Sequence, residues 1–435
     1  MSDWKELVEK ANIAKTKILL SSSEDRVNAM KKVSEALINN ADYIIEQNKI
    51  DLDNATSITP VMKKRLSLTK EKLISIANDV IAVSNLPDPC NRILEEFSRP
   101  NGLVIKKISQ PFGVILTIFE SRPNVCVDIA SLSIKTANVC VLRGGKEAKN
   151  TNIALVNTIR NAIKDYIPED SVVLLTDTTH DDVEEMLQMK DSFDLCVPRG
   201  SKNLINHVVN TSLIPVIETG AGVCHVYVDK DADINMAYDI ILNAKTSNPA
   251  VCNAVESVLV HKDVCEELFK LLKAHDFDTI VSVHGDKTIQ RFMKATDVSS
   301  FDTEFDDLEI NMRVVDSIDE AIKHINTHGT KHSEVIVTKN SSVAHKFMQE
   351  VDAACVYQNA SSRFTDGGCF GFGAELGIST GKLHARGPMG LKEMMTYKYL
   401  IFGNGQVRKW DNKNEKETSN VNCNGWIWIS TCIKR

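Results

Sequence analysis

An alternation of apolar runs and amphipathic segments over residues 113–229 constrains the fold of this chain more than any other feature. It predicts strands at 113–119, 138–143, 172–177, 193–198, 214–219 and 223–229, and helices at 126–136, 148–165, 181–189 and 201–209. Strands separated by helical crossovers form a parallel, doubly wound sheet. Such sheets bind ligands at the carboxyl ends of their strands. This region is therefore predicted to be a ligand-binding α/β domain.

A second alternating region follows. It predicts helices at 231–247, 262–274, 318–327 and 341–351, and strands at 255–261, 279–283, 311–315, 334–338 and 354–358. The first hundred residues favour helices, since apolar side chains recur at nearly helical spacing from Val27 to Leu37. The chain thus contains two α/β regions behind a helical lead-in.

Length and composition exclude several classes of function. The 435 residues suffice for two or three domains, and 58 acidic against 51 basic residues create no general field that attracts nucleic acid or an anionic membrane. The eleven cysteines are odd in number and form no C-x-x-C pair, so neither a disulfide framework nor a metal site is expected. There is no secretory signal pattern, and the longest apolar run, near 113–119, is too short to cross a bilayer. We expect a cytoplasmic protein whose thiols stay reduced.

Cys252 is the strongest candidate nucleophile. It follows a breaker, Ser247-Asn248-Pro249, and lies 34 residues after Glu218, which is followed by the glycine turn Thr219-Gly220-Ala221-Gly222. This spacing, with the sequence Asn248 to Ala254 around the thiol, resembles the aldehyde dehydrogenase superfamily. In that superfamily a strand-end Glu precedes the nucleophilic Cys by the same distance.

Five further segments narrow the resemblance to one family. They are Phe119-Glu120-Ser121-Arg122-Pro123-Asn124-Val125, Val141-Leu142-Arg143-Gly144-Gly145, Val197-Pro198-Arg199-Gly200-Ser201-Lys202, Asn359 to Gly367, and Lys382 to Gly390. In this order, over about residues 5–408, they are similar to the γ-glutamyl phosphate reductases. The resemblance implies an α/β, aldehyde dehydrogenase-like fold with two doubly wound parallel-sheet domains and a small β oligomerisation flap.

The resemblance also divides the chain. It implies a cofactor-binding domain at 1–98 and 113–225, a catalytic domain at 226–372, oligomerisation strands at 99–112 and 390–410, and a tail without a fold assignment at 411–435. Pro111 fits this division, because it interrupts any continuous ladder between the apolar runs on either side of it. The strand predicted at 397–403 has the character of an exposed edge, so a homo-oligomer is expected.

The implied activity is the NADPH-dependent reduction of L-glutamyl 5-phosphate to L-glutamate 5-semialdehyde with release of phosphate, the second step of proline biosynthesis from glutamate. The Cys252 thiolate would attack the γ-carbonyl, and the thioester would accept hydride. Glutamate 5-kinase is a candidate transient partner, because acyl phosphates are labile.

Two alternatives stay open. A hydrolytic, NAD-dependent semialdehyde dehydrogenase predicts a loop of the Pro-Trp-Asn-Phe-Pro type, whereas this chain has Glu120-Ser121-Arg122-Pro123-Asn124. A non-catalytic scaffold predicts loss of the thiol or of the cofactor-binding cations, and this chain retains both.

The catalytic residues implied by the resemblance are Cys252, Arg122, Asn124 and Glu218. The turn Arg122-Pro123-Asn124, together with the backbone N–H of Cys252, is expected to stabilise the oxyanion, and the choice between Arg122 and Asn124 is open. Glu218 is expected to relay a proton or to place a fixed charge near the nicotinamide, the alternative being a structural turn acceptor.

The cofactor residues are implied in the same way. Arg143 matches a basic residue against the adenosine ribose, and Lys146 stands where NAD-preferring members carry a carboxylate, which favours a 2′-phosphate and hence NADPH. A shift of one residue would put Glu147 there and reverse the argument. The N-terminus of the helix predicted at 201–209 suits a pyrophosphate or a 2′-phosphate, because backbone N–H groups and two cations meet there. The residues of this turn are Arg199, Gly200, Ser201 and Lys202. Glu304 matches the carboxylate that holds the nicotinamide ribose.

The substrate carries a phosphate, an α-carboxylate and an α-ammonium, so its pocket needs cations and an acceptor. The substrate-binding residues expected from the resemblance lie after a strand and in a glycine-rich loop; they are Ser361, Ser362, Arg363, His384 and Arg386.

Overall fold

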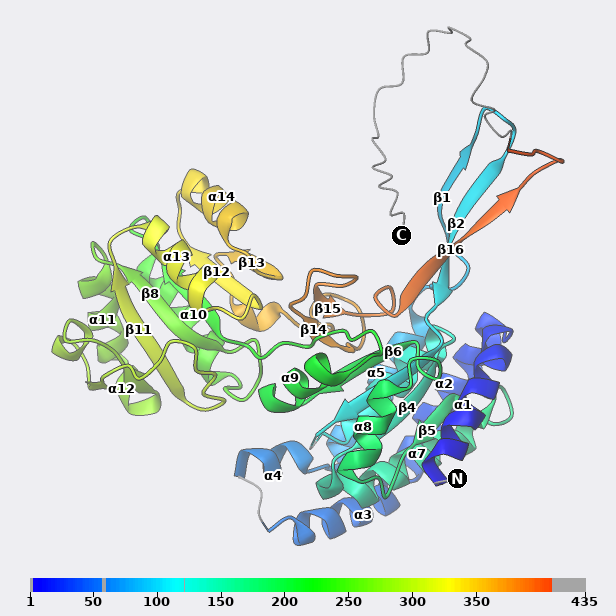
Figure 1. Cartoon of the computed structure of the whole chain (residues 1–435). Coiled ribbons are helices and arrows are strands. Elements are labelled where there is room, and N and C mark those ends of the chain that lie inside the picture. Colours follow the sequence, from blue (N-terminus) through cyan, green and yellow to red (C-terminus); the bar gives the residue numbers. More distant parts are fainter. Residues whose placement is uncertain (1–2, 57–59, 121, 409–435) are drawn as a thin grey trace, which may run out of the picture.

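A computed structural model describes residues 3–56, 60–120 and 122–408 (Figure 1). Two α/β lobes lie beside each other, a small two-stranded sheet lies between them, and a long antiparallel arm projects away from both (Figure 1). The tail predicted at 411–435 lies outside the described residues.

The first lobe contains a four-stranded parallel sheet in the order β5-β4-β3-β6. Its strands are β3 (Val114–Phe119), β4 (Val139–Gly144), β5 (Val172–Leu174) and β6 (Leu195–Arg199). Every residue of β3 is buried, as expected for a central parallel strand covered on both faces. Helices α6 (Asn124–Lys135), α7 (Lys149–Ile163), α8 (His180–Gln188) and α9 (Lys202–Thr211) connect the strands or follow them.

The helical lead-in belongs to the same lobe. It comprises α1 (Asp3–Leu19), α2 (Ser23–Asn39), α3 (Ala41–Asn54), α4 (Pro60–Leu66) and α5 (Lys70–Asn85). Its apolar side chains, including Met30, Val33 and Leu37, join one core with those of β3 and β4. The helices therefore fold onto the sheet and do not form a separate domain.

The second lobe has a seven-stranded parallel sheet in the order β10-β9-β11-β8-β7-β12-β13. The strands are β7 (Cys224–Val228), β8 (Val255–His261), β9 (Ser282–His284), β10 (Ala295–Thr296), β11 (Glu309–Val315), β12 (Ser333–Val337) and β13 (Cys355–Gln358). The helices are α10 (Ile234–Thr246), α11 (Cys265–Ala274), α12 (Phe277–Ile280), α13 (Ile318–His328) and α14 (Ser341–Glu350). Apolar clusters fill both faces of the sheet.

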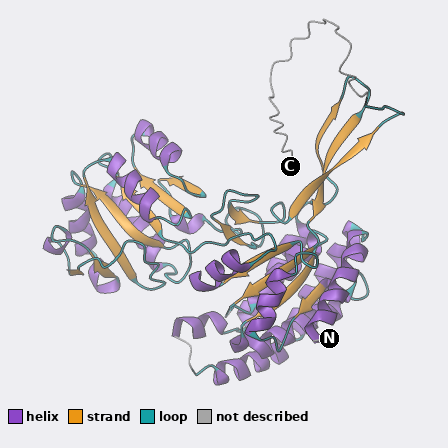
Figure 2. Ribbon diagram, viewed as in Figure 1, coloured by secondary structure: helices purple, strands orange, loops and turns teal. Residues whose placement is uncertain are grey.

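The arm consists of β1 (Ile93–Ser98), β2 (Val104–Pro111) and β16 (Met395–Phe402), with β2 in the middle (Figure 2). It begins at Ile93, before the boundary at 99 that the resemblance implied, because β1 pairs with β2 through a tight turn. The arm carries large apolar side chains that are exposed: Ile93, Leu94, Phe97, Tyr397, Tyr399, Ile401 and Phe402. The small sheet between the lobes is formed by β14 (Gly377–Ser379) and β15 (Gly387–Met389).

The structure confirms the predicted pattern of parallel α/β sheets, with local differences. The segment predicted as a strand at 214–219 forms only an isolated bridge between Val216 and Cys196, since Pro215 has no N–H to donate to a ladder. The strand predicted at 279–283 is shifted, because the short helix α12 occupies 277–280.

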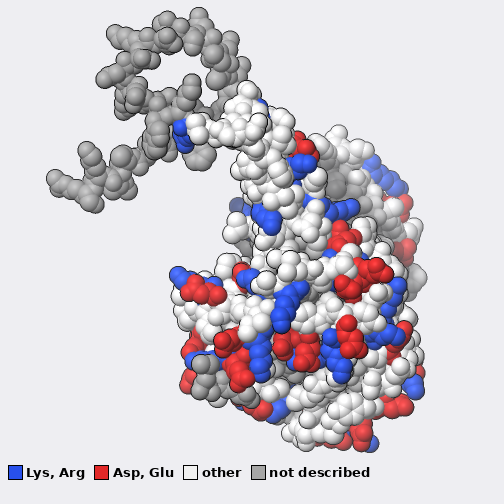
Figure 3. Space-filling view, turned by 90° about the vertical axis from the view of Figure 1, so that its right-hand side faces the viewer, with Lys and Arg blue, Asp and Glu red and all other residues white. Residues whose placement is uncertain are grey.

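The surface and the helices agree with the charge and apolar patterns of the sequence. On the face shown in Figure 3, acidic and basic side chains are interspersed over the lobes. Among the described helices, none is long and apolar enough to cross a membrane.

Candidate active site

A cleft of about 790 Å³ lies where the two lobes meet. From the first lobe, residues just beyond the carboxyl ends of β3 and β6 line it, which agrees with the expected position of ligands at such a sheet. From the second lobe the lining comes from loops at the amino ends of β7, β8 and β11. The cleft therefore joins opposite edges of two sheets, and it contains Cys252 together with Arg122, Arg199 and Glu304.

Cys252 lies in the loop between α10 and β8, where it is half-buried and lines the cleft. Burial raises the pKa of this thiol to about 11, and the carboxylate of Glu375 acts in the same direction. The guanidinium groups of Arg199 and Arg122 oppose this shift of the pKa by favouring the thiolate. The two arginines are thus the groups that can activate the nucleophile.

The glycine turn that precedes β7 packs directly against the backbone of the Cys252 loop. The N–H of Gly222 donates a hydrogen bond to Glu304 Oε1 at 2.7 Å, and the thiol of Cys224 donates to the carbonyl oxygen of Cys252 at 3.2 Å. A Cβ atom on Gly222 would lie 1.5 Å from that same carbonyl oxygen. Only glycine permits this approach, so the turn fixes both the nucleophile and Glu304.

Arg122 and Asn124 point in different directions. Arg122 lines the cleft, and burial together with the nearby Arg199 and Arg65 lowers the pKa of its guanidinium to about 10. Asn124 begins α6, and its side-chain amide donates to Asp128 Oδ2 at 3.0 Å. Arg122 is therefore the better placed of the two to meet an oxyanion at Cys252.

Arg65, on α4, also lines the cleft, and its presence there was not predicted from the sequence. Its Nη2 donates to the carbonyl oxygen of Ala250 at 2.5 Å and lies 2.9 Å from Asp306 Oδ1. It thereby ties the first lobe to the Cys252 loop and to the loop that carries Glu304. The basic run Lys63-Lys64-Arg65 is the signal that could have drawn attention to it.

The turn Arg199-Gly200-Ser201-Lys202 also lines the Cys252 cleft. Ser201 caps α9 by accepting from Leu204 N at 3.4 Å. The backbone N–H of Ser201 donates to Glu120 Oε2 at 2.8 Å, so a carboxylate faces the helix terminus to which a cofactor phosphate was assigned. A phosphate at this helix terminus would have to displace Glu120.

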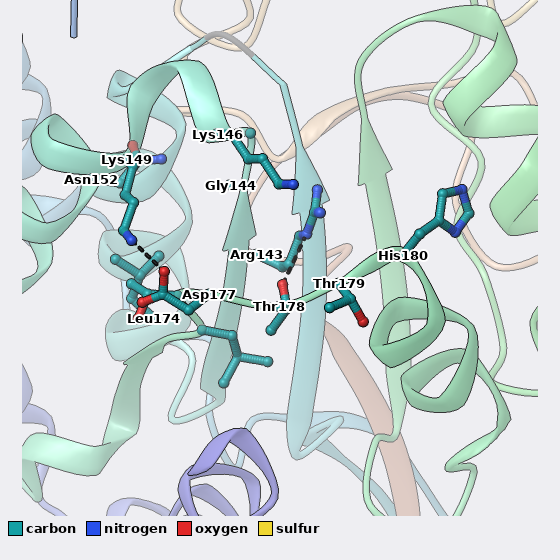
Figure 4. A pocket seen from close by; sticks show the side chains of 13 residues that line it. Arg143, Gly144, Lys146, Lys149, Asn152, Leu174, Asp177, Thr178, Thr179 and His180 are labelled. Atoms are coloured by element: carbon teal, nitrogen blue, oxygen red, sulfur yellow. Dashed lines mark hydrogen bonds and ion pairs between the residues drawn. The ribbon is translucent and has the colours of Figure 1, made fainter. Parts of the chain in front are cut away.

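A second pocket, of about 500 Å³, opens at the carboxyl ends of β4 and β5 (Figure 4). Arg143 and Lys146 both line it, and their side chains extend toward the same space. Arg143 Nε donates to Thr178 Oγ1 at 3.4 Å, while Lys149 is ion-paired with Asp177. The residues assigned to the cofactor therefore divide between two pockets, with Arg143 and Lys146 in this one.

Comparison with known proteins identifies the family. The model of the aldehyde dehydrogenase family matches residues 1–288. The γ-glutamyl phosphate reductase of Clostridium perfringens is 48% identical over 406 residues, which are 92% of this chain and 98% of that protein. That of Ligilactobacillus salivarius is 45% identical over 412 residues, 94% of this chain and 99% of that protein. The chain belongs to the γ-glutamyl phosphate reductases of the aldehyde dehydrogenase family.

Solved structures agree with this family and confirm the predicted fold class. The crystal structure of γ-glutamyl phosphate reductase from Thermotoga maritima has a TM-score of 0.89 at 39% identity, and the match covers 94% of this chain and 100% of that one. An acetylating aldehyde dehydrogenase from Geobacillus thermoglucosidasius has a TM-score of 0.68 at 16% identity, with 93% and 97% covered. The second likeness concerns the fold alone.

Three residues assigned to the substrate brace the Cys252 loop of this reductase. Ser362 Oγ donates to the carbonyl oxygen of Asn253 at 2.7 Å, and Arg363 Nε donates to Ser247 Oγ at 3.0 Å. The guanidinium of Arg363 also donates to the side chain of Asn253, and Ser361 Oγ accepts from the N–H of Arg363 at 3.3 Å. Ser362 and Arg363 therefore bond directly to the segment around Cys252, and Ser361 bonds to Arg363.

His384 and Arg386 follow β14 and make contacts elsewhere in the reductase. His384 Nε2 lies 2.7 Å from the carbonyl oxygen of Glu393, and its ring packs edge-on against Phe112. Arg386 is ion-paired with Asp352 at 2.8 Å. Glu218 is half-buried, and of its neighbours Thr219 and Gly220 line the cleft. His384, Arg386 and Glu218 are not among the described residues that line the Cys252 cleft.

Proposed function

We propose that this chain reduces L-glutamyl 5-phosphate to L-glutamate 5-semialdehyde with release of phosphate, using NADPH, in the biosynthesis of proline. The observation that carries the proposal is the pairing of the Cys252 thiol with Arg122 and Arg199 in one cleft. Curated relatives with 45–48% identity over nearly their whole length bear the name of this activity.

The nucleophile in the proposed reaction is the Cys252 thiolate. Its sulfur attacks the γ-carbonyl carbon, the C–O bond to the phosphate breaks, and phosphate leaves with the bonding electron pair, so that a thioester remains on Cys252. After hydride has been added to the thioester carbon, the C–S bond breaks, which releases the aldehyde and regenerates the thiolate. This release needs no activated water, which agrees with the position of Glu218 away from the cleft lining.

The arginines stabilise negative charge at each stage. Arg122 donates to the oxyanion that forms on the γ-carbonyl oxygen, because its side chain lines the cleft beside Cys252. Arg199 and Arg65, which line the same cleft, supply cations for the phosphate and the α-carboxylate of the substrate. Ser362 and Arg363 act through the Cys252 loop, to which they bond, and Ser361 acts through Arg363.

The donor chemistry of the second pocket fits NADPH. Arg143 and Lys146, which line the pocket, offer two cations for a 2′-phosphate, and the carboxylate of Glu147 acts on Arg143 by raising its pKa. NADPH supplies the hydride when it is bound. Glu304 holds the nicotinamide ribose, in a position that Gly222 fixes. An engineered glycolyl-CoA reductase of this fold, 17% identical, was solved with bound NADP+.

We assign the arm to self-association. Its strands β1 and β16 are both edges, and they expose apolar side chains of which Tyr399 and Ile401 are half or more accessible. The double variant Tyr399→Glu/Ile401→Glu should lower the mass observed by sedimentation, whereas Ile13→Glu, on the equally exposed surface of α1, should not. We also propose a cytoplasmic enzyme that receives its labile substrate from a kinase, glutamate 5-kinase, by transient contact.

The variant Cys252→Ser tests the function directly. It should abolish turnover and leave NADPH binding, measured by fluorescence titration, unchanged, because Arg143 and Lys146 are untouched. An active Cys252→Ser enzyme would refute the role of this thiol. A hydrolytic dehydrogenase is the second candidate, but no observation in this structure favours it over the reductase.

A further inference from the structure

A cluster of two histidines and one glutamate lies where α8 meets α9, outside the Cys252 cleft. His180 and Glu184 are one turn apart on α8, and His207 faces them from α9. Glu184 Oε1 lies 2.5 Å from His207 Nε2 and 3.5 Å from His180 Nδ1. One potential ligand atom from each residue lies within 4.8 Å of the other two.

These three side chains are a suitable ligand set for a divalent transition metal ion. Imidazole nitrogens and a carboxylate oxygen bind Zn²⁺ at about 2.0–2.2 Å, and three such ligands leave a fourth position for water. Ligand atoms around a tetrahedral ion are then roughly 3.3 Å apart. Glu184 Oε1 is near this distance from His180 Nδ1, at 3.5 Å, whereas His207 Nε2 lies 2.5 Å from it and would have to move away by about 0.8 Å. The His180 side chain is exposed, and its ring packs edge-on against that of His207.

The surroundings of the cluster favour a cation. The first turn of α8 carries Asp181 and Asp182, and Glu185 follows Glu184. Asp182 is used in the capping box with Thr179, and Glu185 is ion-paired with Lys5, which leaves Glu184 to the histidines. Glu184 and His207 are half-buried, so they are partly fixed before any ion arrives.

We propose that His180, Glu184 and His207 bind Zn²⁺, or another divalent ion of the same preference for nitrogen ligands, at the rim of the Arg143–Lys146 pocket. His180 also lines that pocket, as its position beside Thr179 in Figure 4 shows. An ion bound here fixes the side chain of His180, one of the residues that line the pocket. This step rests on the proposed function: with NADPH in that pocket, metal occupancy and cofactor binding are coupled, and each changes the affinity for the other by the same factor.

Titration of the full-length, chelator-treated protein with Co²⁺ tests the site. The visible absorption spectrum of bound Co²⁺ distinguishes nitrogen and oxygen ligands from thiolate ligands. The variants Glu184→Gln and His207→Ala should each lower the affinity at least tenfold. His345→Ala, which removes an exposed histidine from α14, is the matched control and should bind as the unmodified protein does. Zn²⁺ should also raise the melting temperature of the unmodified protein more than that of the Glu184 and His207 variants.

Two results would overturn the proposal. Equal Co²⁺ affinity in all four proteins would mean that Glu184 merely accepts hydrogen bonds from the two imidazoles. A thiolate charge-transfer band would show that the ion binds to cysteine. Thermal unfolding without metal serves as the folding check, and NADPH affinity with and without Zn²⁺ tests the coupling independently of the reductase activity.

Discussion

Gly222 and Cys252 approach so closely that a Cβ atom on the glycine would lie 1.5 Å from the carbonyl oxygen of the cysteine. Real atoms cannot share this space, and the backbone of the Cys252 loop would have to move. The same glycine donates its N–H to Glu304, so one residue sets the proposed nucleophile, Cys252, and the proposed cofactor ligand, Glu304, relative to each other.

The variant Gly222→Ala should lower kcat/KM by about a hundredfold or more, because a displacement of about 1 Å in a nucleophile costs that much. Steady-state kinetics measures the effect, and the far-UV spectrum and melting temperature establish whether the fold survives. Gly381→Ala is the control, since a Cβ there meets only the Ser379 hydroxyl at an ordinary 3.6 Å. An unaffected kcat/KM in Gly222→Ala would contradict the close approach.

The reactivity of Cys252 should follow the charges around it. Since burial holds the pKa of the thiol at about 11, the rate of alkylation by iodoacetamide should rise about tenfold for each pH unit between 7 and 9, with no plateau. Arg199→Gln removes a charge that favours the thiolate and should slow alkylation at pH 8. Glu375→Gln removes a charge that opposes the thiolate and should speed it.

Mass spectrometry of the Cys252 peptide measures these rates, with Cys265, a partly exposed cysteine on α11, as the internal reference. If both variants change the rate in the same direction, then the electrostatic account of Cys252 is wrong.

Arg65→Met should lower kcat/KM by about ten- to a hundredfold, because hydrogen bonds from a charged group contribute about 1.5–3 kcal/mol. The lost bonds are those to the Ala250 carbonyl and to Asp306, which join the two lobes across the cleft. Lys63→Met is the matched control on the same helix, where the side chain is exposed. Equal kinetics of the two variants would exclude a role for the Arg65 contacts.

The variant Lys146→Glu should raise the KM for NADPH about tenfold and lower the KM for NADH, because it turns a cation in the second pocket into a carboxylate. Lys149→Gln, which removes a lysine of that pocket already ion-paired with Asp177, should have the smaller effect. Kinetics with both cofactors decide the matter: an unchanged preference in Lys146→Glu would place the 2′-phosphate elsewhere.

The sequence was sufficient to predict the periodic elements of both lobes. Strand β3 and helix α6 appear close to their predicted bounds, because an unbroken apolar run followed by an amphipathic segment has few alternatives in a parallel sheet. The strand expected at 214–219 did not form, because Pro215 lacks the N–H that a ladder requires. Strand β1 was not predicted, because its Leu94 and Phe97 are exposed and the sequence shows no alternation of apolar and polar residues there.

The sequence predicted only those residues of the site that belong to a recognisable motif. Cys252, Arg122 and Glu304 lie together in the cleft, as the family resemblance implied. Arg65 and Glu120 could not be placed from the sequence, since their roles depend on a contact between α4 and the loop of Ala250 and on which group faces Ser201. Long-range contacts of this kind leave no periodic signal in the chain.

The phosphate dependence of the reverse reaction tests the central claim most directly. Oxidation of glutamate 5-semialdehyde by NADP+ should require phosphate or arsenate, because in the proposed mechanism phosphate, and not water, resolves the thioester on Cys252. The account predicts a rate that rises from near zero to saturation with phosphate and disappears in Cys252→Ser. Oxidation that proceeds equally fast without phosphate or arsenate would contradict it.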